Sequence, residues 1–200
     1  MKNILLAAVL ATSFGAANAA LVNGSFDDQV QSAGSWNVYQ TVPGWTTTSG
    51  SGIEVRNSVA GNSYDGSNYV ELDAYSNSSM SQTVTTTAGA LYTLSFAYSA
   101  REGVSYESNP IQALWNGNAV ANVSGDGAGQ SGNMWNVYSY NVIGTGHDTL
   151  TFAALGTSDT LGGSLDAVSL TAAVPEPSTW ALMLGGVGLI GFSLRRRTAR

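Results

Sequence analysis

The sequence predicts an all-β protein, an antiparallel β-sandwich of the jelly-roll type, flanked by an N-terminal signal peptide and a C-terminal transmembrane helix. Three observations lead to this prediction. Charged residues make up only 10% of the 200 residues, and the basic ones gather at the two ends. Between the ends, short runs of alternating apolar and polar residues are separated by glycine-rich turns. Aromatic residues reach 10%, enough for a packed core.

We divide the chain into a signal peptide (residues 1–19), a β-sandwich domain (20–173) and a C-terminal sorting segment (174–200). The domain holds 12 acidic and 2 basic side chains, a net charge of −10. Such a surface repels polyanions, so we expect no nucleic-acid partner. The absence of cysteine and the single histidine argue against thiol catalysis, disulfide scaffolds and zinc fingers.

The N-terminus has the three parts of a secretory signal peptide in their usual order. Lys2 supplies the positive charge, and residues 4–14 form an apolar run that is too short to span a bilayer. Ala17-Asn18-Ala19 is a small-x-small cleavage site, so we expect signal peptidase to cut before Ala20. Export would place a cysteine-free domain in an oxidising compartment, where only its core stabilises it.

The domain itself is predicted as a series of short strands. The clearest covers residues 91–99, where large apolar side chains alternate with small polar ones. Further strands are expected at 53–56, 68–73, 80–85, 111–115, 135–143, 149–155 and 165–171. Turn signals such as Asp65-Gly66 and Gly162-Gly163 separate them, a texture typical of an antiparallel sandwich or jelly roll.

The C-terminal segment combines prolines, an apolar run and an arginine cluster. Pro175, Glu176 and Pro177 end the last strand and stiffen a short linker. The following 17 residues, 178–194, carry no charge, which is the lower limit for a membrane helix; we place the span at about 180–194. The basic residues Arg195, Arg196 and Arg197 then mark the cytoplasmic side. A buried helix of the domain is the alternative, but the run has no polar face.

This order of features resembles the PEP-CTERM sorting signal. The resemblance implies a Gram-negative bacterium that makes extracellular polysaccharide. It also implies an exosortase, a membrane protease that cleaves near Pro175-Glu176-Pro177. The tail would then hold the protein in the inner membrane only transiently, before release to the cell surface or the extracellular matrix.

Motifs of the domain resemble a second family. Residues 21–27 (Leu-Val-Asn-Gly-Ser-Phe-Asp) look like the opening strand of galactose-binding-like jelly rolls, and Val42-Pro43-Gly44-Trp45 looks like the turn that follows. Residues 69–73 and 165–170 continue the pattern, which is similar to DUF642-type and choice-of-anchor domains. The resemblance implies a jelly-roll binding module that is often associated with carbohydrate and often carries one structural calcium.

Two aspartates are the candidate calcium ligands. Asp166 shares strand parity with Val168, so we expect it to lean toward the core, where a carboxylate needs compensation. Asp27 becomes its partner if the first and last strands are neighbours, and the resemblance implies ligands at these two places. Calcium binds such carboxylate oxygens. In the alternative, Asp166 accepts backbone N–H bonds or pairs with Arg56 or Arg101.

Aromatic residues in or beside predicted loops are the candidate sugar contacts, because flat rings stack on the C–H faces of pyranoses. The set is Trp36, Tyr39, Trp45, Tyr64, Tyr75, Tyr106, Trp115 and Trp135. From it we select Tyr75, Tyr106 and Trp115, and we expect Trp45 to pack inward behind the Pro-Gly turn. The alternative is that most of these rings fill the edges of the sandwich.

No catalytic residue is assigned. Glycoside hydrolysis needs two carboxylates facing one cleft, and no pair of acids has that setting. Glu71 alternates with Val70 and Leu72, which favours a solvated face. The leading hypothesis is a non-enzymatic exported surface or matrix protein that associates with extracellular polysaccharide. A secreted polysaccharide-active enzyme and a structural matrix protein without a sugar site are the alternatives.

Overall fold

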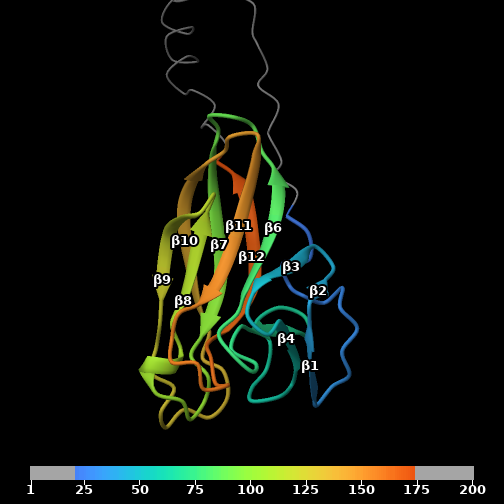
Figure 1. Cartoon of the computed structure of the whole chain (residues 1–200), viewed down its shortest axis with the longest axis vertical. Coiled ribbons are helices and arrows are strands. Elements are labelled where there is room, and N and C mark those ends of the chain that lie inside the picture. Colours follow the sequence, from blue (N-terminus) through green and yellow to red (C-terminus); the bar gives the residue numbers. More distant parts are fainter. Residues whose placement is uncertain (1–20, 174–200) are drawn as a thin grey trace, which may run out of the picture.

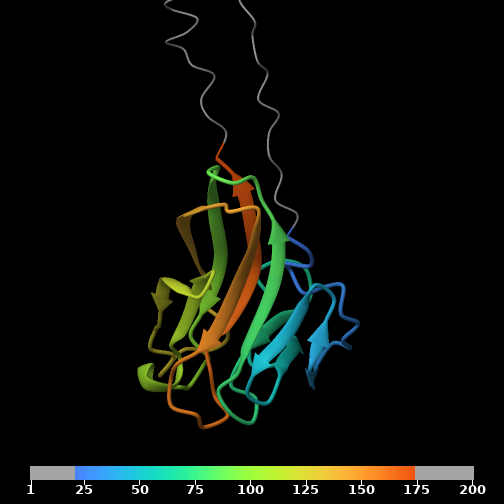
Figure 2. The same ribbon diagram turned by 45° about the horizontal axis from the view of Figure 1, so that its top comes forward.

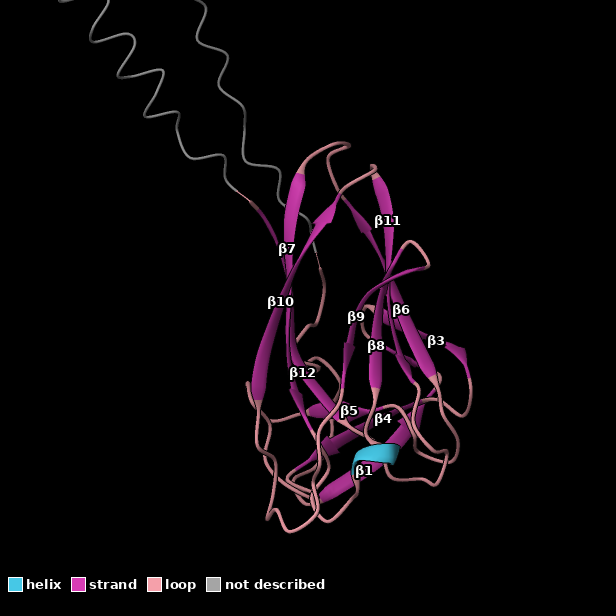
Figure 3. Ribbon diagram, turned by 90° about the vertical axis from the view of Figure 1, so that its left-hand side faces the viewer, coloured by secondary structure: helices cyan, strands magenta, loops and turns pink. Residues whose placement is uncertain are grey.

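The computed structural model describes residues 21–173, which form two antiparallel sheets packed face to face (Figure 1). In spatial order, sheet A contains β1 (Ser35–Tyr39), β4 (Ile53–Asn57), β5 (Tyr69–Glu71), β12 (Ser164–Ala172), β7 (Leu91–Ser99) and β10 (Asn136–Ile143). Sheet B contains β2 (Thr41–Val42), β3 (Trp45–Ser49), β6 (Ser79–Thr85), β11 (His147–Ala154), β8 (Ile111–Trp115) and β9 (Asn118–Val123). Figure 3 shows the sheets nearly edge-on, with a short 3-10 turn at Tyr106–Ser108 (cyan) near their lower end.

The predicted all-β sandwich is confirmed. All eight predicted strands are present, and β7 and β8 have the predicted bounds. Four short strands were not predicted: β1, β2, β3 and β9. The opening strand expected at residues 21–27 is wrong, because positive φ angles at Asn23 (51°) and Phe26 (60°) fold this segment into turns.

The predicted signal peptide and membrane segment lie outside the described residues. Within residues 21–173, no helix has the length and apolar character needed to cross a membrane.

The core lies between the sheets and includes the Trp45 ring. This ring is buried, as predicted, with its centroid 5.8 Å from that of Phe26 and 6.0 Å from that of Phe152. Its Nε1 donates a hydrogen bond to the Asn23 carbonyl at 3.1 Å. The Asn-Gly-Ser-Phe and Pro-Gly-Trp motifs therefore pack against each other, which explains why they occur together.

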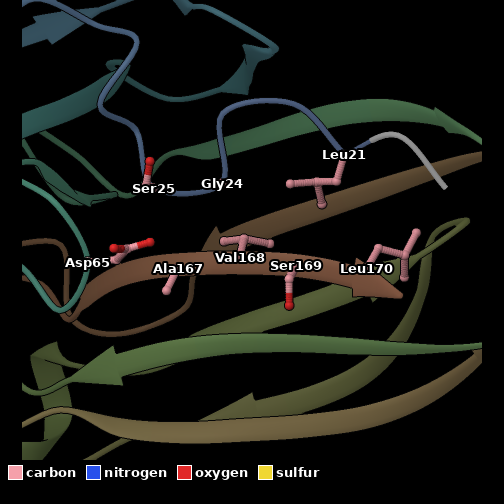
Figure 4. Close-up of a pocket in the computed structure, with 8 residues that line it drawn as sticks. All are labelled: Leu21, Gly24, Ser25, Asp65, Ala167, Val168, Ser169 and Leu170. Atoms are coloured by element: carbon pink, nitrogen blue, oxygen red, sulfur yellow. The ribbon is translucent and has the colours of Figure 1, made fainter. Parts of the chain in front are cut away.

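The N-terminal segment also docks on the last strand. Val168 donates its N–H to the Gly24 carbonyl at 2.9 Å, and Figure 4 shows the two residues side by side. A Cβ atom at position 24 would lie 1.8 Å from the Val168 carbonyl oxygen, so this close approach of two backbones requires glycine. Residues 21–27 and β12 are therefore neighbours, as the expected pairing of Asp27 with Asp166 required, although residues 21–27 do not form a strand.

A β-bulge in β12 changes the face on which Asp166 lies. The register with β7 shifts between Asp166 and Ser169, and Ala167 has a φ of 48°. Leu165 points into the core, so the adjacent Asp166 points to the outer side of sheet A. The expected parity with Val168 is therefore wrong, because a bulge inserts one residue between the two positions.

The loops gather at one end of the sandwich. The segments after β7, β9 and β11 lie at the lower end in Figures 1 and 2, whereas β12 ends at the opposite end. The pairing of Ser164 with Ser99 and of Ala172 with Tyr92 fixes this direction. This loop-bearing end carries the site described next.

Candidate functional site

A cleft with a volume of about 320 Å³ opens on the outer side of sheet A at its loop-bearing end. Two neighbouring strands and four loops form it. Its lining residues are Trp36, Glu54, Arg56, Val59, Ala74, Tyr75, Arg101, Thr160 and Leu161. We refer to this site as the charged cleft.

The pairing of β4 with β1 and β5 places the residues at the floor of the charged cleft next to one another. In β4, Ile53 and Val55 belong to the core, so Glu54 and Arg56 project from the opposite face. Arg56 lies opposite Trp36 of β1, and Glu54 lies opposite Glu71 of β5. One short strand thus supplies both an acid and a base to the outer face of the sheet.

The only two basic side chains in residues 21–173 converge here. Arg56 Nε lies 2.5 Å from Glu54 Oε1, and its Nη2 lies 3.1 Å from Glu71 Oε2. Arg101 Nη1 lies 2.9 Å from Glu71 Oε1. Two acids and two bases therefore form one ion-pair cluster with no net charge.

Glu71 is 0% exposed, so the expected solvated face is wrong for this residue. The loop between β11 and β12 covers the sheet here, and Gly162 donates its N–H to Glu71 Oε1 at 2.8 Å. Burial raises the pKa of Glu71 to about 7, although Arg56 and Arg101 act to lower it. For Arg56, burial acts to lower the pKa, but Glu71 and Glu54 outweigh it and the pKa is raised.

One guanidinium nitrogen of Arg56 is buried without a partner beneath the charged cleft. Arg56 is 4% exposed, and its Nη1 has no hydrogen-bond partner among the described residues. This nitrogen has almost no accessible surface, so a ligand in the cleft would contact other parts of the Arg56 side chain. A buried donor without a partner is unfavourable.

Backbone strain is stored at the rim of the cleft. Thr160 has a φ of 73°, an outlier for a β-branched residue. Its N–H donates to Asp73 Oδ2 at 3.1 Å, and its carbonyl accepts from Arg101 Nη1 at 3.2 Å. Strained residues held by their surroundings are frequent at functional sites. Here the strain places Arg101 at the wall of the cleft.

The aromatic candidates separate into different environments. Tyr75 meets Trp36 at the cleft with ring centroids 6.5 Å apart in an edge arrangement; the residues are 66% and 43% exposed. Tyr106 is 56% exposed in the 3-10 turn and does not line the cleft. Trp115 is 6% exposed, and its Nε1 donates to the Ile143 carbonyl at 2.9 Å. Only Tyr75 of the three therefore has a second ring beside it at a cleft.

Asp166 anchors the loop between β4 and β5. Its Oδ2 accepts the N–H groups of Tyr64 at 2.7 Å and Asp65 at 3.0 Å, and its Oδ1 accepts that of Ala167 at 2.6 Å. The alternative in which Asp166 accepts backbone N–H groups is therefore confirmed. Neither Arg56 nor Arg101 pairs with Asp166, because both arginines pair with glutamates. Burial raises the pKa of Asp166 to about 7. No salt bridge in the described part of the chain involves this carboxylate.

Asp27 anchors the same loop three residues further on. Its Oδ1 accepts the N–H groups of Ser67 and Asn68, both at 2.9 Å. The buried Oδ1 of Asn68 has no hydrogen-bond partner in residues 21–173. Orphaned and carboxylate oxygens around one loop are the donor type that calcium takes. No group of three His, Cys, Asp or Glu side chains clusters in the described residues, so amide and backbone oxygens would complete such a site.

A shallow hollow of about 280 Å³ lies beside this loop (Figure 4). Gly24, Val168 and other small or apolar residues line it, and Asp65 is its one ionisable side chain. The hollow therefore offers few polar groups compared with the charged cleft.

Sequence reasoning included Trp36 among the rings but missed the ion-pair cluster. The sequence did contain a signal for this cluster. The acidic domain has only two basic residues, and one of them, Arg56, follows Glu54 by two positions. In a strand this spacing places the two opposite charges on the same face. The partner carboxylate Glu71 could not be identified without the strand pairing.

The C-terminal segment has a recognised identity. Residues 173–197 match the family model of the PEP-CTERM protein-sorting motif. The chain carries a PEP-CTERM sorting motif. The PEP-CTERM motif indicates an exported protein that reaches the cell surface or the extracellular space.

This PEP-CTERM chain is also similar to parts of larger proteins. It is 32% identical over 155 residues to the multifunctional-autoprocessing repeats-in-toxin of Vibrio vulnificus, which covers 74% of the chain but 3% of the toxin. The chain thus spans about 3% of the curated relatives it matches.

Solved structures of low sequence identity share the fold of the domain. The K2 cleaved adhesin domain of Lys-gingipain superimposes with a TM-score of 0.51 at 14% identity, over 74% of this chain and 96% of that one. A family 35 carbohydrate-binding module from Clostridium thermocellum has a TM-score of 0.46 at 19% identity, over 70% and 99%. The first of these supports the two-sheet sandwich and no more than the fold.

Proposed function

We propose that the protein is a non-enzymatic, exported glycan-binding protein of the bacterial surface or extracellular matrix. Signal peptidase would remove residues 1–19, and the apolar run at about 180–194 would hold an intermediate in the inner membrane of a Gram-negative cell. Exosortase would then release the sandwich to the cell surface or the matrix. The sorting motif supports this route.

The observation that carries the binding proposal is the pair of exposed rings, Trp36 and Tyr75, above buried polar groups. Aromatic faces stack on the C–H surface of a pyranose, while polar groups at the floor fix its orientation. The charged cleft has both parts, with Arg56 and Glu54 at the floor. We therefore assign extracellular polysaccharide to this cleft.

The charge distribution favours a neutral glycan. The ion-pair cluster has no net charge, and residues 20–173 around it carry −10, so an acidic polymer would be repelled at long range. Stacking and hydrogen bonds to neutral hydroxyls are hardly screened by salt. Binding is thus expected to depend little on ionic strength.

The placement of the carboxylates supports binding rather than hydrolysis at this cleft. Glycosidases need two carboxylates at the scissile bond. Glu54 is the one carboxylate among the lining residues, whereas Glu71 lies behind them with both oxygens bonded by arginine. This arrangement supports a non-catalytic role.

Removing either ring should abolish most of the affinity. We expect Trp36→Ala and Tyr75→Ala to weaken binding of a neutral polysaccharide ligand by tenfold or more, by analogy with nucleobases, whose stacking on one aromatic side chain is worth about 1–3 kcal/mol. Titration calorimetry on the exported protein measures this effect. Tyr106→Ala, which removes an exposed ring outside the cleft, is the matched control. Unchanged affinity in both cleft variants, with unchanged melting temperature, would refute the assignment.

We also propose a structural calcium at the loop held by Asp27 and Asp166. The buried carboxylate of Asp166, which has no salt-bridge partner in residues 21–173, and the orphaned Asn68 Oδ1 support it. A chelator is expected to lower the melting temperature of the exported protein by several degrees, and Asp166→Asn should remove that sensitivity. Asp126→Asn, at an exposed turn, should keep it. A protein that melts identically with and without chelator would leave both aspartates as loop anchors alone.

A further inference from the structure

We infer that the free edge of β10 is an interface at which two copies of this chain pair about a two-fold axis at Ser139. This edge lies at the opposite end of sheet A from β1 and β4, which form part of the charged cleft. Three features carry the inference: an unprotected strand edge, an uncharged side of the sandwich, and a sequence in β10 that reads nearly the same in both directions.

The edge of β10 lacks the devices that protect the other sheet edges. β10 is eight residues long, and its register with β7 runs without a shift. The edge strands β1 and β2 have only five and two residues, and β9 contains a bulge at Val120, where its register with β8 shifts. β10 contains neither proline nor a charged residue, and such long, regular edges are prone to pair with another strand.

The backbone groups of alternate residues in β10 point to this free edge. Gly144 directly follows β10 and donates its N–H to the Ala90 carbonyl at 2.9 Å, on the side of β7. The Ser95 hydroxyl of β7 donates to the Tyr138 carbonyl at 3.1 Å. Both bonds show that even-numbered positions of β10 face β7. Because the backbone groups alternate between the two sides of a strand, the odd-numbered positions face the free edge.

The odd-numbered positions are Val137, Ser139, Asn141 and Ile143, and their side chains are exposed. The Ile143 carbonyl already accepts from Trp115 Nε1. Within residues 21–173, the N–H and C=O groups of the other three have no hydrogen-bond partner. A row of unpaired backbone groups is a template for one more strand.

The side of the sandwich around this edge carries no charge. β7, β8, β9 and β10 contain no Asp, Glu, Lys or Arg, although residues 20–173 as a whole carry −10. Figure 3 shows β10 along one side of the molecule (left). Two copies of so acidic a domain repel each other, and contact through this side keeps their acidic groups apart.

The sequence of β10 suits pairing with a second copy of itself. Antiparallel pairing about Ser139 sets this residue opposite its own copy, Tyr138 opposite Tyr140, and Val137 opposite Asn141. Odd-numbered positions then lie opposite odd-numbered positions, so their edge-facing N–H and C=O groups bond to each other. The two tyrosine pairs add aromatic cross-strand contacts. A two-fold contact closes on itself, so we expect a dimer rather than a fibre.

The dimer would present two charged clefts on one face. A two-fold axis of this kind stands perpendicular to the joined sheet, so the outer side of sheet A faces the same way in both copies. The antiparallel β10 strands place the two loop-bearing ends far apart. Given the proposed function, on which this step alone rests, the dimer would hold two stretches of one polysaccharide and gain avidity.

The test places charges at the two-fold axis. Sedimentation velocity of the exported protein, without glycan, should show a dimer whose fraction rises with protein concentration. Ser139→Lys and Ser139→Glu each set like charges opposite one another and should weaken dimerisation tenfold or more. An equimolar mixture of the two variants should restore it, because lysine then faces glutamate. Thr171→Lys, which adds the same charge on the exposed face of β12, is the control and should dimerise normally.

Hydrogen exchange of the unchanged protein gives a readout that does not depend on the folding of a variant. The amides of Val137, Ser139 and Asn141 should exchange severalfold more slowly at high than at low protein concentration. The amides of β1, at the other edge of sheet A, should not respond to concentration.

The outcomes distinguish this inference from glycan binding, which the cleft variants test separately. A monomer at every concentration overturns the inference, and so does a dimer that forms equally well in Ser139→Lys. Open-ended assemblies also overturn it. If the folded lysine and glutamate variants stay monomeric when mixed, the axis does not pass through Ser139 and the inference is wrong.

Discussion

Replacing Arg56 by alanine is expected to lower the free energy of unfolding by about 3–5 kcal/mol, because the change leaves buried carboxylates without their cation. Arg56 pairs with both Glu54 and Glu71, and all three side chains are almost fully buried. Urea unfolding of the exported protein, followed by tryptophan fluorescence, measures the change.

The pH dependence of the Arg56→Ala variant gives a second measurement. Burial already raises the pKa of Glu71 to about 7 with Arg56 present, and loss of the cation raises it further. The folded variant then holds a proton that the unfolded chain binds only near pH 4.5. Its stability should therefore rise as the pH falls from 8 to 5.

Two controls show whether the ion pairs are the cause. Arg101→Ala should have a smaller effect, because the Arg101 side chain is 19% exposed and solvent replaces part of the pairing. The triple variant Glu54→Leu/Arg56→Met/Glu71→Leu should recover much of the loss, since an apolar triad needs no counterion. A loss below about 1 kcal/mol in Arg56→Ala would mean that water reaches the cluster.

Changing Pro175, Glu176 and Pro177 together to alanine is expected to stop processing. The PEP-CTERM motif at residues 173–197 is the proposed recognition element for exosortase. Full-length protein should then accumulate in the membrane fraction, and the released form should disappear. Cell fractionation with mass spectrometry of the product measures both effects.

The matched control for sorting lies outside the matched residues. Thr198→Ala changes a residue beyond position 197 and should leave the mature mass and its location unchanged. Release of a product of normal mass from the triple-alanine variant would show that the motif does not direct processing.

Much of the fold could be predicted because a strand with one buried face alternates apolar and polar residues, and this pattern is visible in the sequence. The 91–99 strand is the clearest case, with Tyr92, Leu94 and Phe96 in the core. β3 escaped prediction because four of its five residues are Ser or Thr. β1 and β2 are short strands at sheet edges, where little apolar surface is buried. Residues 21–27 have strand-like composition, but contacts with Trp45 and Val168 fold them into turns.

The site was less predictable because long-range register creates it. Glu54 meets Glu71 only when β4 pairs with β5, and Arg101 reaches them from a loop after β7. The bulge at Ala167 also has no sequence signal, since an alanine at a positive φ is stabilised by tertiary contacts rather than by local preference. Tyr75 was selected because it lies in a predicted loop, but its contact with Trp36 depends on the pairing of β1 with β4.

The direction of β12 has a mechanical consequence. This nine-residue strand starts beside the loops of the charged cleft and ends at Ala172, a path of roughly 25–30 Å. If a glycan held at one end pulls against an attachment that follows Ala173, the force passes lengthwise along β12. The hydrogen bonds to β7 then carry the load in shear, many at once, instead of opening one after another as in a zipper. Under that condition, the orientation of β12 would let the sandwich resist tension between the glycan and the attachment.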